Sequence, residues 1–171
     1  MLPMPSSTPH STPLSAPHAA AWTVHCDGTA LPNPGRMGLG AVLTAPDGTR
    51  HTLSQATGTH GCNNEAEVRA LIAALQLLQD LGAQPAALNI CSDSSVLVVQ
   101  LDGAAPAAPI VRLTHVFDEA RQLLQQFSNV RLGWVPRHRN TAADTLARAA
   151  LGLPDKSGIK PRPKKRHARR K

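Results

Sequence analysis

The chain has 171 residues, about the length of one domain, and 42% of them are hydrophobic. No apolar run approaches the roughly 20 residues that a membrane-spanning helix needs, so the composition argues against a membrane protein. The three cysteines are odd in number and widely spaced, which excludes a disulfide scaffold and disfavours a zinc ribbon. Aromatic residues make up only 2%, which disfavours a module that stacks bases on exposed rings.

The net charge of +7 is unevenly distributed and predicts three parts. Residues 1–21 contain five prolines and no Lys, Arg, Asp or Glu, which is typical of a disordered leader. This leader lacks the basic and apolar regions of a secretory signal, which favours a cytoplasmic protein. Residues 22–155 contain nine arginines, no lysine and eleven acids, as expected for a slightly acidic folded domain. Residues 156–171 contain five lysines, four arginines and no acid, which predicts a disordered basic tail that binds a polyanion.

The first half of the folded domain is predicted to form three strands and a long helix. Residues 22–28 alternate in polarity and end at a turn, as a strand does. Residues 38–45 and 50–59 flank a Pro-Asp-Gly turn, which indicates a β-hairpin. Over 63–81, apolar side chains recur at steps of three and four residues, and a glycine follows. This spacing predicts an amphipathic helix.

Strands and helices alternate in the second half. The short apolar segment 88–93 is typical of a central strand covered on both faces, and 130–136 is predicted to be a fifth strand. Residues 96–101, 111–127 and 141–152 have helical patterns. The whole order predicts an α/β fold, in which a mixed sheet carries helices on its faces.

Four acidic residues occupy positions where such a sheet can bring them together. Asp27 and Asp93 end the first and fourth strands, and binding sites of open α/β sheets lie outside the carboxyl ends of strands. Glu67 lies one turn inside the long helix, and Asp144 lies in the first turn of the last one. Each also has a purely structural explanation taken alone, such as a favourable charge at a helix N-terminus for Asp144.

The sequence around all four acids resembles the type 1 ribonuclease H family. Four segments carry the resemblance, in order and at similar spacing: Asp27–Gly35 with Gly38–Gly40, Asn63–Glu67, Ser92–Ser94, and Trp134–Asn140 with Ala143–Ala147. The resemblance covers residues 22–151. It implies a ribonuclease H-like fold, with a five-stranded sheet of three antiparallel strands followed by parallel ones. It also implies an endonuclease that hydrolyses the RNA strand of RNA–DNA hybrids and leaves 5′-phosphate and 3′-hydroxyl ends.

The resemblance further implies two divalent ions held by Asp27, Glu67, Asp93 and Asp144. Clustered carboxylates disfavour one another's ionisation unless cations arrive, and hard oxygen ligands select Mg²⁺ or Mn²⁺. Two such ions activate a water on one side of a phosphate and stabilise the leaving oxygen on the other. We expect Asp27 to bridge both ions, Glu67 and Asp93 to hold the ion near the leaving 3′-oxygen, and Asp144 to hold the ion that carries the attacking water.

His138 is a candidate for proton transfer or product release. In much of the family a histidine in the loop before the last helix has this role, and an imidazole that titrates near neutrality suits it. The loop is short in this chain, and many short-loop relatives carry a glutamate there. A surface histidine beside a phosphate path is therefore an equally open interpretation.

Substrate contacts are assigned to neutral side chains near the acids. Asn33, Asn63 and Asn64 match family positions that contact backbone phosphate, 2′-hydroxyls and minor-groove edges, although ordinary turn and capping chemistry is the alternative. Cys62 stands where relatives often have a threonine that contacts a DNA phosphate, and a thiol donates weakly. Ser94, in the third motif, is the remaining candidate.

The basic handle that some family members insert is replaced by an uncharged stretch after Asp102, Gly-Ala-Ala-Pro-Ala-Ala-Pro. We therefore expect the tail at 156–171 to tether the hybrid through phosphate contacts. An RNA localiser and a nuclear-import-like signal are the alternatives for the tail. For the whole chain, the alternatives are a catalytically weak nucleic-acid-binding module and a superfamily nuclease that acts on another duplex. We expect a monomer without a membrane partner.

Overall fold

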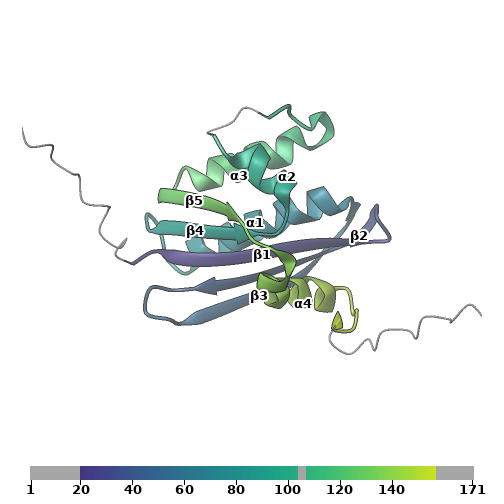
Figure 1. Cartoon of the computed structure of the whole chain (residues 1–171), viewed down its shortest axis with the longest axis horizontal. Helices are drawn as coiled ribbons and strands as arrows, with labels where there is room; N and C mark the ends of the chain where they lie inside the picture. Colours follow the sequence, from purple (N-terminus) through teal and green to yellow (C-terminus); the bar gives the residue numbers. More distant parts are fainter. Residues whose placement is uncertain (1–19, 104–106, 157–171) are drawn as a thin grey trace, which may run out of the picture.

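The computed structural model describes residues 20–103 and 107–156. The leader predicted at 1–21 lies almost wholly outside these residues, as does the tail predicted at 156–171 except for Lys156. Figure 1 shows one sheet with helices on both of its faces.

The sheet has five strands in the spatial order β3-β2-β1-β4-β5. Their bounds are β1 Trp22–Leu31, β2 Gly35–Thr44, β3 Arg50–Gly61, β4 Ala87–Ser92 and β5 Ser128–Trp134. β1, β2 and β3 pair in antiparallel fashion, whereas β4 lies parallel to both β1 and β5. The predicted mixed sheet, with three antiparallel strands followed by parallel ones, is therefore confirmed. β4 lies inside the sheet as its apolar sequence indicated.

Four α-helices and two short 3₁₀ turns complete the described part of the chain. Their bounds are α1 Asn63–Asp80, α2 Ser95–Leu101, η1 Val111–Leu113, α3 Thr114–Leu124, η2 Arg137–Arg139 and α4 Thr141–Ala150. α1, α2 and α3 lie on one side of the sheet and α4 lies on the other (Figure 1). None of the helices in the described ranges is both long and apolar enough to cross a membrane.

The helix predicted over 111–127 is shorter in the structure. Residues 111–113 form η1, and α3 ends at Leu124. The chain then turns, which places Phe127 in the core with only 7% of its surface exposed. Burial of a large apolar side chain contributes about 1.5–3 kcal/mol, so the turn is favoured over further helix.

α1 packs along one face of the sheet. Its apolar face, including Val68, Leu71, Leu75 and Leu78, is fully buried against the sheet and α3. The helix ends at Asp80, and the predicted glycine follows two residues later: Gly82 has φ +70°, a conformation that residues with a side chain rarely adopt. Packing along the whole of α1 sets the position of its first turns, which border the end of β1.

Glycine allows the helices to approach the sheet closely. A Cβ atom on Gly28 of β1 would lie 2.1 Å from the carbonyl carbon of Ala66 in α1. On the opposite side of the sheet, a Cβ atom on Gly40 of β2 would lie 2.2 Å from the carbonyl oxygen of Ala143 in α4. Both helices that carry candidate acids are therefore seated directly on strand backbone.

Candidate active site

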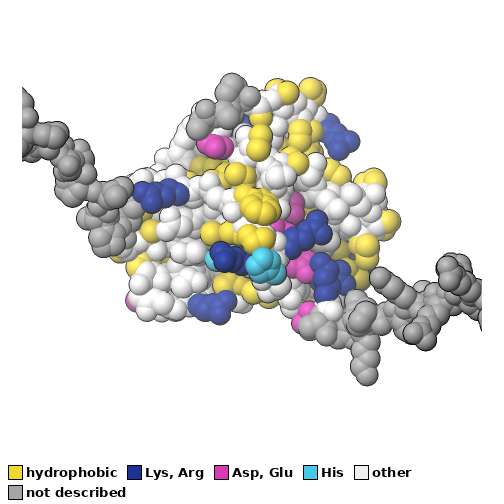
Figure 2. All heavy atoms as spheres, viewed as in Figure 1, with side chains coloured by type: hydrophobic (Ala, Val, Ile, Leu, Met, Phe, Trp, Pro, Cys, Tyr) yellow, Lys and Arg dark blue, Asp and Glu magenta, His cyan; other side chains and the backbone are white. Residues whose placement is uncertain are grey.

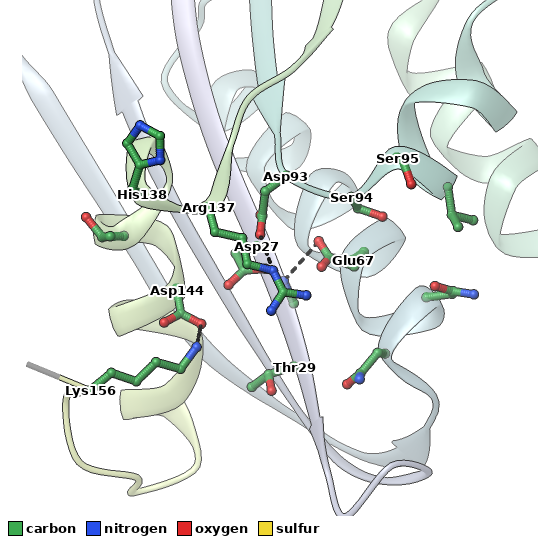
Figure 3. Close-up of a pocket in the computed structure, with 15 residues that line it drawn as sticks. Asp27, Thr29, Glu67, Asp93, Ser94, Ser95, Arg137, His138, Asp144 and Lys156 are labelled. Atoms are coloured by element: carbon green, nitrogen blue, oxygen red, sulfur yellow. Dashed lines mark hydrogen bonds and ion pairs between the residues drawn. The ribbon is translucent and has the colours of Figure 1, made fainter. Parts of the chain in front are cut away.

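Three of the predicted acids meet at one point. Asp27 lies on β1, Glu67 lies on α1, and Asp93 follows β4. Each of them offers a carboxylate oxygen, and these three oxygens lie within 4.8 Å of one another. Asp144 of α4 lies on the opposite wall of the same cavity, which has a volume of about 790 Å³ (Figure 3).

The backbone around the acids explains their convergence. The prediction that Asp27 ends the first strand is wrong, because β1 continues to Leu31 in its pairing with β2. β4 runs parallel to β1 only as far as the pair His25 and Cys91, so Asp93 follows β4 beside the middle of β1, where Asp27 lies. Gly28 lets α1 come close, and its N–H donates to Oε2 of Glu67 at 3.3 Å. The indole N–H of Trp134 donates to the backbone carbonyl of Asp93 at 3.1 Å, which holds the end of β4 against the end of β5.

The acids disfavour one another's charge. Burial, followed by the charge of Asp93, raises the pKa of Asp27 to about 7. Burial and the charge of Asp27 also raise the pKa of Glu67 well above its usual value. Only 5% of the Asp27 surface is exposed, so water can do little to stabilise its ionised form. The cluster is therefore electrostatically unfavourable until positive charge enters it.

Asn140 is a site residue to which the sequence analysis gave no role. Its side-chain Nδ2 donates to the carbonyl of Cys26 at 2.9 Å and to Oδ1 of Asp93 at 2.7 Å, and only 2% of the residue is exposed. It thus connects β1 to the loop after β4 and fixes the orientation of Asp93. The available signal was its place in the fourth motif, one helical turn before Asp144.

Two cations also stand among the acids and were not predicted to lie there. Lys156 Nζ lies 2.8 Å from Oδ1 of Asp144. Arg137 Nε lies 3.7 Å from Oδ2 of Asp93, although the arginine side chain is 91% exposed and this long ion pair is weak. Figure 3 shows both side chains at the cavity. Asp93 and Asp144 thus have positive neighbours within the protein, whereas Asp27 is buried and Glu67 is half-buried beside it.

The candidate asparagines take part in local structure. Oδ1 of Asn33 accepts from the N–H of Asn63 at 3.1 Å, and Oδ1 of Asn63 accepts from the N–H of Ala30 at 2.8 Å. The first bond joins the turn after β1 to the first residue of α1, in line with the capping alternative, whereas the second joins α1 to β1 itself. Asn63 and Asn64 also line the acidic cavity, so their side chains border the place where a substrate would lie.

Cys62 and Ser94 both precede helices. Cys62 is the N-cap residue of α1 without a side-chain capping bond, and its Sγ lies 3.9 Å from a guanidinium nitrogen of Arg112. Oγ of Ser94 accepts from the N–H of Leu97 at 3.2 Å and so caps α2. Ser94 also lines the cavity of the acids.

His138 borders the same cavity but does not point toward the acids. It lies on η2, and Figure 3 shows its ring directed away from Asp93 and Asp27. The histidine stands at the rim, between this cavity and a second one on the side of β2 and β3.

The raised pKa of Asp27 predicts how the stability of the metal-free protein depends on pH. The native carboxyl group keeps its proton up to about pH 7, whereas an unfolded aspartate titrates near pH 3.9. Between these values the native state binds more protons, so the free energy of unfolding falls as the pH rises. We expect the melting temperature in EDTA to fall between about pH 4 and pH 7, and to fall less in Asp27→Asn. Equal falls in the two proteins would contradict the assignment.

The comparisons with known proteins agree with this geometry. Residues 25–150 match the profile of the family described as "Reverse transcriptase-like", and the chain belongs to this family. Within it, the chain is 38% identical over 126 residues to Ribonuclease HI of Halobacterium salinarum, a match that covers 73% of this chain and 61% of that protein. It is also 38% identical over 129 residues to Bifunctional protein Rv2228c of Mycobacterium tuberculosis, of which the match covers 35%. The chain thus spans only part of these relatives.

Solved structures confirm the ribonuclease H fold. The crystal structure of RNase H1 from Halobacterium salinarum superposes with a TM-score of 0.70 at 34% identity and covers 77% of this chain and 98% of that one. LC11-RNase H1, solved in complex with an RNA/DNA hybrid, superposes with a TM-score of 0.68 at 30% identity and covers 77% of this chain and 96% of that one. The resemblance to type 1 ribonucleases H is therefore confirmed.

Proposed function

We propose that this protein is an endonuclease that hydrolyses the RNA strand of RNA–DNA hybrids. The observation that carries the proposal is the convergence of Asp27, Glu67 and Asp93 beside Asp144, in a chain of this family. Hydrolysis would leave a 5′-phosphate and a 3′-hydroxyl. The similarity to LC11-RNase H1, whose structure contains an RNA/DNA hybrid, supports the choice of substrate.

The donor set fits divalent cations. Three converging carboxylates offer hard oxygen ligands, which suit Mg²⁺ and Mn²⁺, and the raised pKa values of Asp27 and Glu67 reflect a need for positive charge there. Asp27, Glu67 and Asp93 would hold one ion, and Asp27 with Asp144 a second. When bound, the two ions would lower the pKa of a water and stabilise the leaving oxygen.

The remaining residues orient the acids and the substrate. Asn140 holds Asp93 at a fixed angle, so the carboxylate requires no reorganisation when a ligand arrives. Lys156 forms an ion pair with Asp144, and both side chains line the cavity. We also propose His138 as a proton carrier at the rim, where an imidazole can exchange protons with solvent.

Recognition of the RNA strand would fall to the start of α1 and the turn before it. The amide groups of Asn33, Asn63 and Asn64 can both donate and accept, as a 2′-hydroxyl requires. Oδ1 of the first two is already bonded within the protein, which leaves their NH₂ groups to donate. Cys62 and Ser94 are proposed to contact the backbone on either side.

A substrate panel tests the proposed function. Matched hybrid, double-stranded RNA and double-stranded DNA are incubated with Mg²⁺, Mn²⁺ or EDTA, and the ends of the products are identified. We expect cleavage of the RNA strand of the hybrid alone, in the presence of metal. Binding without cleavage would indicate a nucleic-acid-binding module instead, and cleavage of another duplex would indicate a different nuclease of the superfamily.

We propose that the basic tail tethers the hybrid. Residues 157–171 carry eight of the nine tail cations, and residues 22–155 contain no lysine. A chain that ends at Lys156 keeps the contact with Asp144 and should show a higher KM, a shallower dependence of KM on salt and a nearly unchanged kcat. An unchanged salt slope would contradict the tether. Cytoplasmic location and the monomeric state stay predictions.

A further inference from the structure

A second cavity lies beside the acidic one, on the side of the sheet that α4 covers. It has a volume of about 230 Å³ and is enclosed by the middle of β1 and β2, the start of β3 and the first turn of α4. His138 lines both cavities, so the two are neighbours along the surface. A strand of nucleic acid that crosses the acids and continues past His138 would reach this second cavity.

The lining of the second cavity is basic. Four side chains with cationic or titratable nitrogen contribute to it, namely His25, Arg50, His138 and Arg139, and no aspartate or glutamate does. Figure 2 shows Lys/Arg and His side chains gathered next to the acidic ones on this face. The charge of Arg50 helps to lower the pKa of His25, after burial, which agrees with their proximity.

Arg50 and Arg139 are both exposed to solvent. Arg69, Arg121 and Arg137 form ion pairs with acids, whereas no ion pair of the described ranges joins Arg50 or Arg139 to an acid. A guanidinium group without an acid partner is free to bind a phosphate through two parallel hydrogen bonds.

The first turn of α4 adds backbone donors to the same cavity. Thr141, Ala142 and Ala143 line it, and the first N–H of this region that bonds within the helix belongs to Asp144, which donates to the carbonyl of Asn140 at 3.1 Å. The Asn140 side chain does not cap these N–H groups: its Oδ1, the atom that could accept from them, is buried and has no hydrogen-bond partner. Helix N-termini favour anions, so this end of α4 reinforces the charge of the arginines.

We infer that this cavity is a phosphate subsite that binds the substrate strand at a phosphodiester outside the cleaved one. The inference rests on the proposed function, since it assumes that a nucleic-acid strand crosses the acids. Arg50 and Arg139 supply the charge, and the N-terminus of α4 supplies neutral donors. The subsite would hold the strand in register with the acids, in a domain that has no lysine before residue 156.

The test compares full-length Arg50→Ala/Arg139→Ala with the wild type on hybrids that carry one neutral methylphosphonate linkage at successive positions. In the wild type, the methylphosphonate linkage at one particular position away from the cleaved bond should raise KM by about tenfold. This is the effect of losing a charged hydrogen-bond pair. In the double variant, KM should already be higher for the unmodified hybrid, and the same linkage should have no further effect. The kcat should stay within about twofold.

Arg121→Ala is the matched control, because this arginine lies on α3, across the sheet from α4. Both substituted arginines are exposed, so melting temperatures should be unchanged. Identical linkage profiles in the wild type and the double variant would overturn the inference while leaving the proposed function intact. If the wild type cleaves no hybrid, the proposed function fails. The affinity for hybrid in EDTA then tests the phosphate subsite by itself. Equal affinities of the wild type and the double variant would overturn the inference.

Discussion

Asp27→Asn is expected to reduce the rate of hybrid cleavage by about a thousandfold or more. Asp27 lies at the centre of the acids, and bound metal ions stabilise a transition state by several kcal/mol, each 1.36 kcal/mol of which changes the rate tenfold. Asparagine has nearly the same shape but cannot ionise, so the fold should persist. The measurement is single-turnover cleavage at saturating Mg²⁺ or Mn²⁺, with circular dichroism of the same samples.

Asp80→Asn is the matched control for this substitution. Asp80 is the last residue of α1 and is exposed, far along the helix from the acids. Its variant should cleave at the rate of the wild type. Full activity of Asp27→Asn would refute the assignment of the site, and a loss of folded signal would show that the substitution tests stability instead.

Gly28→Ala is expected to have the largest effect on stability. The added Cβ atom would lie 2.1 Å from the carbonyl carbon of Ala66 and 2.4 Å from the backbone nitrogen of Glu67, and neither backbone atom can move without shifting α1. Overpacking of this kind costs about 1–3 kcal/mol or more, which lowers the melting temperature by roughly 5–10 °C. Displacement of α1 also moves Glu67 away from Asp27, so metal affinity should fall.

Gly133→Ala separates this effect from a general sensitivity to alanine. Gly133 lies in β5. A Cβ atom added there would have the carbonyl oxygen of Ile90, at 4.0 Å, as its nearest neighbour. We expect thermal denaturation of this variant to match the wild type. A Gly28→Ala protein that melts like Gly133→Ala and binds Mn²⁺ normally would show that the close approach of α1 to β1 does not position Glu67.

Much of the fold could be predicted because local patterns and tertiary packing agree. The alternation in β1, the turn between β2 and β3, and the apolar spacing of α1 each point to the element that forms. Two segments differ from the prediction. β1 continues beyond residue 28 to Leu31 because β2 pairs with it there. The pattern of 111–127 is helical throughout, but burial of Phe127 requires a turn that no local signal marks.

The acids could be proposed from the sequence because motif order and the end of β4 constrain them, although β1 continues past Asp27. Their neighbours could not. Asn140 acts through bonds to Cys26 and Asp93, which are 114 and 47 residues away, and these pairings exist only after the sheet forms. Lys156 was assigned to the tail by composition, since nothing local marks its ion pair with Asp144. Asn33 accepts from the first N–H of α1, which agrees with the capping that sequence reasoning had left open beside substrate contact, whereas Asn63 accepts from Ala30 of β1, a long-range bond that no local signal marks.

The central claim is that the carboxylates of Asp27, Glu67, Asp93 and Asp144 form one site for divalent cations. A crystal soaked in Mn²⁺ tests it most directly, through anomalous scattering measured at the manganese edge. The account predicts manganese peaks coordinated by oxygens of Asp27, Glu67 and Asp93, and a second peak that displaces Lys156 from Asp144. Ordered side chains of these four acids without a manganese peak among them would contradict it.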